Sequence, residues 1–375
     1  MKRLQQVIET VWQRQSLWSK IGWAALVPLS LGFSCAVRGR NLLYDTGLLP
    51  ITQVDLNVIS VGNLTVGGSG KTPLTLWLAQ EFQRKGYRTG VLTRGYKGTA
   101  TGITVVGKNG TPLATIAEVG DEAVLLARRF AGVVLAGRDR SAAALMAQQQ
   151  FDLQVVILDD GFQHRRLPRD VDILLVTAQQ LRNTWLLPAG PLREPISSAR
   201  RANLIVYTKS ERRSSDSPID PLAQVPLSPV PRFYGDFVPT ALIQSVHGNW
   251  QELPLALLAG KRVTTITGIA TPAPFFDTVR QQGATVAKVM EFPDHHRYTN
   301  RDWQEIRQES QAHGLVVTTE KDLVKLEQFP PLSTQLVALR GEMRIDPTEP
   351  FFFAIEQRFR YKHGDRTKHG RTVSH

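Results

Sequence analysis

The sequence has little cysteine and few acidic residues. Its 375 residues include one cysteine, Cys35, which excludes an internal disulfide and a cysteine-based zinc site and fits a reducing compartment. Asp and Glu number 33 against 45 Lys and Arg, a net charge of +12. This excess lies at the ends, because residues 1–40 and 357–375 carry +5 each and leave +2 for the remainder. A nucleic-acid groove needs a basic face on the folded body, so we expect no nucleic-acid partner.

Long uncharged runs are also rare, and the most prominent one lies near the N-terminus. Residues 21–37 contain no charged side chain and follow an amphipathic stretch with helical periodicity. A helix of that length, at about 1.5 Å per residue, falls short of a hydrocarbon core about 30 Å thick, and Pro28 and Gly32 interrupt it. We therefore expect residues 1–40 to form an interfacial or shallowly inserted anchor on an anionic membrane surface. A secretory signal and a buried core helix are the alternatives.

After residue 56 the pattern alternates between short apolar strands and amphipathic helices, which predicts a doubly wound, mostly parallel α/β sheet. The expected strands are 57–61, 90–93, 133–136, 155–158, 173–176 and 204–207, and the expected helices 73–84, 121–130 and 140–149. A second, smaller α/β unit is expected from strands 262–267, 287–292 and 315–319 and helices 274–282 and 301–312. The predicted boundaries are an anchor over 1–40, a nucleotide-binding domain over 41–213, a proline-rich linker over 214–232, the smaller domain over 233–356 and a basic, disordered tail over 357–375.

A glycine-rich loop follows the first strand and precedes a helix. It consists of Thr65, Val66, Gly67, Gly68, Ser69, Gly70, Lys71 and Thr72. This is a Walker A loop in which Thr65 replaces the first glycine; its backbone N–H groups would cradle phosphates at a helix N-terminus. Lys71 would reach the β- and γ-phosphates of ATP, and Thr72 would bind Mg²⁺. Val66 stands where partitioning-type ATPases carry a second lysine, which disfavours a motor-like ATPase.

A second motif supplies acidic residues that could bind the Mg²⁺ ion. Four apolar residues end in Asp159, as in a Walker B strand, and Asp160 and Gln163 follow closely. We expect Asp159 to hold Mg²⁺ directly or through water, with Asp160 beside it and Gln163 near the γ-phosphate. An ordinary strand-end turn is the alternative, which the pairing with the glycine-rich loop disfavours.

Taken together, the motifs resemble those of the tetraacyldisaccharide 4'-kinase family over roughly residues 20–330. The matching blocks are 63–72, 93–96 (TRGY), 119–122 (VGDE), 159–164 (DDGFQH), 187–195 (LPAGPLREP), 294–296 (DHH) and 319–322 (TEKD). The resemblance implies a P-loop kinase that uses ATP and Mg²⁺ to phosphorylate a lipid A disaccharide precursor at the cytoplasmic face of the inner membrane. It also implies that Asp121 is the base, assisted by His295, with closure of the second domain bringing His295 over the cleft.

Other residues of these blocks have more than one role open to them in the sequence alone. Arg94, Arg193 and Glu194 are candidates for recognising phosphate or substrate, together with Gln163, because arginine forks suit phosphate. Asp121 has an alternative role as a helix cap, the 294–296 block as a solvated loop, and Arg94 as a surface ion-pair partner. Glu320 and Lys321 lie either near the nucleotide or at a strand end.

Two other classes of function are weighed against the lipid kinase. One is a membrane-associated P-loop ATPase or GTPase switch without a lipid acceptor; the absence of an NKxD motif after the strand at 204–207 counts against it. The other is a kinase or ligase of a soluble metabolite, which leaves residues 1–40 unexplained. A requirement for a lipid acceptor separates these classes.

Overall fold

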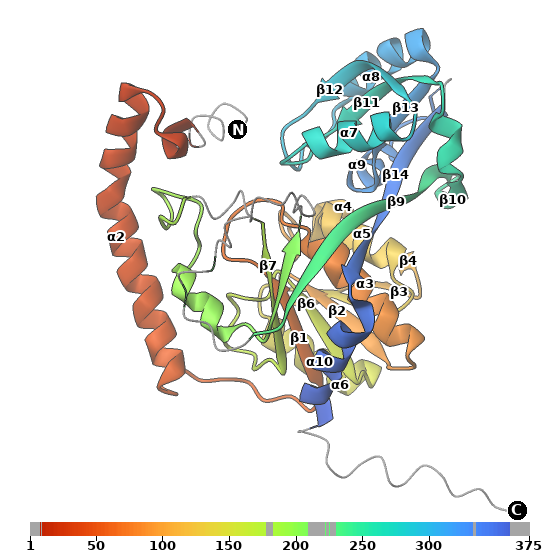
Figure 1. The fold of residues 1–375 in the computed structure, drawn as a ribbon. Coiled ribbons are helices and arrows are strands. Elements are labelled where there is room, and N and C mark those ends of the chain that lie inside the picture. Colours follow the sequence, from red (N-terminus) through yellow and green to blue (C-terminus); the bar gives the residue numbers. More distant parts are fainter. Residues whose placement is uncertain are drawn as a thin grey trace, which may run out of the picture. The chain divides into compact units, whose positions relative to one another are not determined.

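The computed structural model describes residues 8, 10–177, 183–208, 222, 225, 230–332 and 335–360 (Figure 1). Most of the expected linker and the tail from residue 361 lie outside the described residues. The chain forms two compact units, each assembled from separate segments. Unit 1 comprises residues 1–9, 93–138 and 237–343, and unit 2 comprises residues 10–92, 139–236 and 344–375. This division differs from the continuous boundaries expected from the sequence, since 93–138 groups with 237–343.

Unit 2 is built on a parallel sheet in the order β9-β8-β7-β1-β6-β2. Its strands are β1 (Asn57–Gly62), β2 (Thr89–Thr93), β6 (Val155–Asp159), β7 (Val171–Val176), β8 (Leu204–Thr208) and the first part of β9 (Arg232–Val246). Its other elements are α3 (Lys71–Arg84), α6 (Arg140–Phe151), the 3-10 turn η2 (Ile196–Arg201) and α10 (Thr348–Arg360). Every residue of β1 is buried, as expected for a central parallel strand covered on both faces.

The helix α2 (Leu17–Asp45) also belongs to unit 2 and differs from the expected interrupted anchor. It runs without a break through Pro28 and Gly32, beginning at an N-capping box made by Ser16 and Ser19. Its 29 residues span about 43 Å at about 1.5 Å per residue. Among the described residues it is the one helix long and apolar enough to cross a membrane, and only 11% of its most apolar window is buried.

The outward surface of α2 is apolar. Leu17, Trp18, Ile21, Leu29 and Leu31 are all more than half exposed, and Cys35 is exposed on the same helix. Exposed large apolar groups at this density mark an interaction surface in a soluble domain or a membrane contact.

Unit 1 contains two groups of strands. The first is β5 (Val133–Ala136) with antiparallel β3 (Thr104–Lys108) and β4 (Thr111–Pro112), accompanied by α4 (Ile116–Val119) and α5 (Asp121–Arg129). The second runs β12 (Thr285–Glu291), β11 (Arg262–Thr267), β13 (Leu315–Thr319), β14 (Gln335–Asp346), β9 and β10 (Asn249–Leu253). Its helices are η3 (Leu255–Leu258), α7 (Ala273–Gln281), α8 (Asn300–His313) and α9 (Glu320–Leu326), and α5 packs against α9.

Alternation along β13 shows how the second sheet of unit 1 is covered. Leu315 and Val317 belong to the apolar cluster that contains α7, whereas Val316 belongs to the cluster that contains α8. Successive strand residues point to opposite faces, so α7 and α8 cover opposite faces of this sheet. The expected doubly wound arrangement is confirmed, and the strands and helices named from the sequence agree with it to within three residues at each end.

Candidate active site

The glycine-rich loop leaves β1 and opens directly into α3. Gly70 is the N-cap residue of α3 with φ of 87°, and Gly67 has φ of 101°. Both conformations are in the left-handed region, which glycine adopts without steric cost. The helix therefore begins at Lys71, with its N-terminal N–H groups and dipole directed at the loop.

The predicted acidic residues lie beside this loop because β6 is the parallel neighbour of β1. Val61 is paired in register with Asp159, so both strands end at the same edge of the sheet. Thr72 Oγ1 lies 3.3 Å from one carboxylate oxygen of Asp159, and Thr75 Oγ1 lies 3.2 Å from the other. Thr72 and Asp159, which the sequence assigns to one Mg²⁺ site, are therefore in contact.

Lys71 lies among polar groups of the loop, of Asn63 before it and of Asp160 after β6. Its ammonium is 3.2 Å from Asn63 Oδ1, 3.3 Å from the carbonyl oxygen of Gly67 and 3.8 Å from Asp160. Arg193 donates to the other oxygen of Asp160 at 2.7 Å. Burial alone would raise the pKa of Asp160, but the charges of Lys71 and Arg193 outweigh burial and lower it.

Arg193 and Gln163 are held at the loop by backbone contacts. The N–H of Arg193 donates to the carbonyl of Leu64 at 2.7 Å, and the N–H of Val66 donates to the carbonyl of Pro191 at 2.9 Å. Gln163 Nε2 donates to the carbonyl of Asn63 at 2.9 Å. The 187–195 segment and the phosphate-binding loop are thus paired main chain to main chain.

Glu194 has a different place from the one that a phosphate- or substrate-binding role suggests. Its carboxylate is fully buried and accepts from Arg201 at 2.9 Å, Arg40 at 3.2 Å and Asn41 at 3.0 Å. Burial would raise the pKa of Glu194, but Arg201 and the hydrogen bonds outweigh burial and lower it. Arg40 and Asn41 belong to α2. Their contacts therefore attach this helix to Glu194, the residue next to Arg193.

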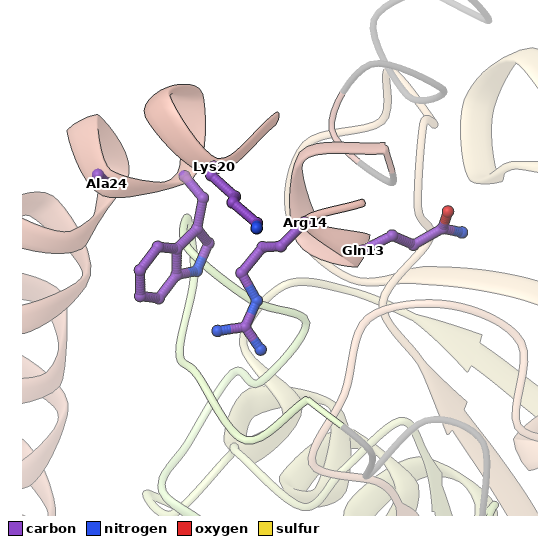
Figure 2. Close-up of a pocket in the computed structure, with 5 residues that line it drawn as sticks. Gln13, Arg14, Lys20 and Ala24 are labelled. Carbon is purple, nitrogen blue, oxygen red and sulfur yellow. The ribbon is translucent and has the colours of Figure 1, made fainter. Parts of the chain in front are cut away.

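The N-terminal half of α2 contacts residues 186–189, which adjoin the same segment. Ser30 Oγ donates to the carbonyl of Leu186 at 2.7 Å, and Trp23 Nε1 donates to that of Ala189 at 3.1 Å. Beside Trp23, an open cavity of about 530 Å³ is lined by Gln13, Arg14, Lys20, Trp23 and Ala24. Figure 2 shows the Arg14 and Lys20 side chains side by side at this cavity, and both give it a positive charge.

Unit 1 contains Asp121 and His295, the predicted base and its assisting histidine, and the two side chains are in contact. Gly120 precedes α5 with φ of 85°, and a Cβ there would lie 2.1 Å from the carbonyl oxygen of Tyr96. Gly120, not Asp121, is therefore the N-cap residue of α5. Asp121 is the first helical residue, 5% exposed, and its Oδ1 lies 2.9 Å from His295 Nδ1. The sequence placed these two residues in different domains, whereas the structure brings them together within one unit.

His295 lies on a tight turn after β12. Its φ of 56° is in the left-handed region, and its N–H donates to the carbonyl of Gly268 at 3.1 Å. Asp322, fully buried, accepts from the N–H of Gly268 at 2.9 Å and from Thr319 Oγ1 at 2.8 Å. Asp322 thereby fixes the loop on which His295 rests, which is a positional role that the sequence did not indicate.

The neighbouring His296 has a structural role. Its Nε2 lies 2.9 Å from Asp302, which also caps α8, and its ring stacks on Phe292. Of the two adjacent histidines, His295 is the one that contacts Asp121.

Two lysines of α9 supply positive charge to the Asp121 carboxylate. Lys325 Nζ lies 3.5 Å from Asp121 Oδ2, and Lys321 Nζ lies 3.1 Å from His295 Nε2. Burial alone would raise the pKa of Asp121, but the hydrogen bond from His295 and the charges of Lys321 and Lys325 outweigh burial and lower it well below its ordinary value. Asp121 is thus ionised at neutral pH. Arg94, in the same unit, is exposed.

The parallel sheet, the glycine-rich loop at a helix N-terminus and the acidic residues on the adjacent strand define a P-loop nucleotide-binding protein. A family model described as Tetraacyldisaccharide-1-P 4'-kinase matches residues 22–360. The chain belongs to this kinase family and is an enzyme.

Relatives and a solved structure agree with this assignment. The chain is 41% identical to a tetraacyldisaccharide 4'-kinase of Pelobacter propionicus over 84% of this chain and 86% of the relative. It is 38% identical to the enzyme of the same name from Geobacter sulfurreducens, over 87% and 91% of the two chains. The crystal structure of LpxK from Aquifex aeolicus in complex with ATP is similar, with a TM-score of 0.75, 33% identity and coverage of 90% of this chain and 99% of that one.

Proposed function

We propose that this kinase transfers the γ-phosphoryl group of ATP to the 4'-hydroxyl of a tetraacyldisaccharide 1-phosphate, a lipid A precursor, in lipopolysaccharide biosynthesis. The observation that carries the proposal is the presence of two complementary groups in a chain of this family. Unit 2 has a phosphate-binding loop beside Asp159, and unit 1 has an ionised carboxylate hydrogen-bonded to His295. The first group suits a nucleotide, and the second suits a hydroxyl that must lose its proton.

The nucleotide side rests on residues 65–72. Their backbone N–H groups and the α3 N-terminus would bind the phosphates, and Lys71 would leave Asn63 and Asp160 to contact the γ-phosphate. Arg193 and Gln163, fixed by the main chain, would orient the same group. Catalysis in this unit is electrostatic stabilisation and positioning, with no covalent intermediate on the protein.

The residues beside the loop fit a magnesium ion. Thr72 Oγ1 and Asp159 supply hard oxygen ligands 3.3 Å apart, and Asp160 Oδ1 is buried without a hydrogen-bond partner. Within the described residues no set of three or more His, Cys, Asp or Glu forms a closed cage, and Mg²⁺ usually completes its shell with phosphate oxygens and water. Bound there, Mg²⁺ would neutralise charge on the β- and γ-phosphates.

The acceptor side rests on Asp121 and His295. A sugar hydroxyl has a pKa far above neutral, so its attack on phosphorus is assisted by a group that takes the proton. Asp121 is ionised and close to His295, which makes this pair the proton acceptor in our proposal. Lys71 in unit 2 and Asp121 in unit 1 then serve the two halves of one reaction.

Helix α2 suits an acceptor whose acyl chains stay in a bilayer. Its apolar surface is exposed, and the cavity with Arg14 and Lys20 adjoins it. We place this helix in the cytoplasmic leaflet of the inner membrane, where anionic lipid headgroups attract basic side chains and ATP is available.

The proposal is tested with purified full-length protein, γ-labelled ATP, Mg²⁺ and tetraacyldisaccharide 1-phosphate in mixed micelles. We expect the label in a lipid that carries one more phosphate, at the 4' position. Label released only as inorganic phosphate, with or without the lipid, would instead indicate the ATPase switch. Transfer to a soluble sugar phosphate with no preference for the lipid would overturn the lipid acceptor.

A further inference from the structure

Lys321 lies beside the proposed Asp121–His295 pair and contacts three groups at once. Its ammonium is 3.1 Å from His295 Nε2, 2.9 Å from Glu122 Oε1 and 3.3 Å from Asp294 Oδ1. An ammonium has three N–H donors and no acceptor, so each of these contacts uses one donor. The side chain is largely buried, at 15% exposure.

These contacts determine where the imidazole carries its proton. Since Lys321 can only donate, Nε2 of His295 must accept and has no proton of its own. The other nitrogen, Nδ1, faces the ionised carboxylate of Asp121 at 2.9 Å and is the donor there. Donor and acceptor requirements on the two sides therefore agree on a single form of the ring, neutral and protonated at Nδ1.

The surrounding charges would favour a different form without Lys321. Three carboxylates surround the ring: Asp121 at 2.9 Å from Nδ1, and Glu122 and Asp294 each 3.8 Å from Nε2. Against them stand Lys321 and, next to Asp121, Lys325. The Tyr96 ring contacts the imidazole edge to face at 5.3 Å and carries no charge. Removing Lys321 would leave Nε2 facing two carboxylates, an arrangement that favours the doubly protonated imidazolium.

We propose that Lys321 is a positioning residue that holds His295 neutral in the Nδ1–H form, so that the carboxylate of Asp121, and not Nε2, takes the proton of the acceptor hydroxyl. This inference rests on the function proposed above. It gives the lysine of the 319–322 block a role, acting through His295 on Asp121. An imidazolium would bind Asp121 as an ion pair and weaken it as a base, which is what Lys321 prevents.

The experiment uses the full-length protein labelled with ¹⁵N-histidine in detergent micelles, as wild type, K321M, K321R and K288M. Nitrogen–proton correlation spectra report the form of His295, assigned by its disappearance in H295Q. The pH dependence of lipid phosphorylation is measured on the same samples between pH 6 and 9. Lys288 is the matched control, because it pairs with Glu309 at 3.2 Å in the same unit without contacting the cluster.

We expect the wild type and K288M to show a neutral ring protonated at Nδ1 at pH 7. K321M should show the imidazolium there and lose about tenfold more activity at pH 6.5 than at pH 8.5, because a low pH protonates the ring that Lys321 kept neutral. K321R, which retains the charge and donors, should recover most of the wild-type profile.

An Nε2–H ring or an imidazolium in the wild type at pH 7 would overturn the inference, and this result does not depend on whether K321M folds. An unchanged ring signal and an unchanged pH profile in K321M would overturn it as well. The proposed function fails separately, if D121N and H295Q phosphorylate the lipid at wild-type rates. Loss of activity in those two variants together with a wild-type K321M would reject only the role of Lys321.

Discussion

The phosphate-binding loop of unit 2 and the Asp121–His295 cluster of unit 1 differ in the chemical groups that form them. The loop is eight consecutive residues whose conformation depends on glycine and whose binding groups are mostly backbone N–H. The cluster joins side chains from three places, with Asp121 and His295 separated by 174 positions and Lys321 a further 26. The loop depends on a local backbone conformation, whereas the cluster depends on the balance of charges among its side chains.

This difference predicts different sensitivities. The backbone N–H donors of the loop do not titrate, so the affinity of the loop for phosphate should change little with pH, whereas the cluster depends on the ionisation of several side chains. A substitution in the loop removes a contact to the ligand. A substitution in the cluster also redistributes protons among the remaining members.

The largest effect is expected for Lys71→Ala, which tests the loop alone. Removing a charge that stabilises the transferred phosphoryl group should lower kcat about 10³-fold or more, because transition-state charge is then unscreened. Initial rates of lipid phosphorylation at saturating ATP measure this. Lys85→Ala, at the other end of α3 and paired with Glu356, is the control and should stay near wild type. Full activity in Lys71→Ala would show that the loop does not bind the reacting phosphate.

Asp121→Asn breaks the cluster while leaving the loop intact. We expect kcat to fall about 10²- to 10³-fold, since general-base assistance is typically of that size, with ATP affinity changed less than about twofold. Nucleotide binding and turnover are measured on the same preparation. Asp277→Asn, on an exposed pair with Arg280 in the same unit, should have no effect. A large loss of ATP affinity in Asp121→Asn would contradict the assignment of nucleotide binding to the loop and proton transfer to the cluster.

Glu194→Gln tests the contact between α2 and the segment beside the loop. The substitution keeps the shape but leaves Arg201, Arg40 and Asn41 without a buried counter-charge, so we expect a loss of about 3 kcal/mol in the free energy of unfolding. Chemical denaturation measures it. Glu356→Gln, which removes a surface pair with Lys85, should cost about 0–1 kcal/mol. An equal loss of unfolding free energy in the two variants would mean that the buried Glu194 contacts stabilise the protein no more than a surface ion pair does.

The smallest effect concerns acid stability. Because the pKa of folded Asp121 lies below its ordinary value of 3.8, its ionised form stabilises the protein above that pH, and this contribution disappears as pH falls toward the folded pKa. The difference in unfolding free energy between wild type and Asp121→Asn should therefore shrink below pH 4, by up to about 1.4 kcal/mol per pH unit. Denaturation curves at pH 6, 4 and 3 test this. A difference that grows at low pH would mean that the pKa is raised.

The same contrast explains what could be predicted from the sequence. The loop and Asp159 were predictable because glycine spacing, an adjacent strand and a following helix are all local patterns. The choice of Asp121 and His295 came from the family resemblance, and their direct contact could not be derived from spacing. Lys321 was left undecided because its partners, Glu122 and His295, lie on separate segments, and only the fold shows that its ammonium fits between them.

Two further features of the fold could not be predicted from local sequence patterns. Pro28 and Gly32 predicted a break in the N-terminal helix, but α2 continues through both because its inner face is held by Ser30 and Trp23 against residues 186–189. The long strands β9 and β14 were not predicted, since residues 232–246 and 335–346 contain Pro239 and Gly341, and tertiary pairing overrides these local preferences.

The scarcity of cysteine has a practical consequence for α2. Cys35 is exposed on that helix and is the one thiol in the sequence. A fluorophore or spin label attached to the native protein therefore reports a single position, without prior removal of other cysteines. Quenching of such a label by lipid-borne or aqueous quenchers would measure directly how deeply the middle of α2 lies in a bilayer.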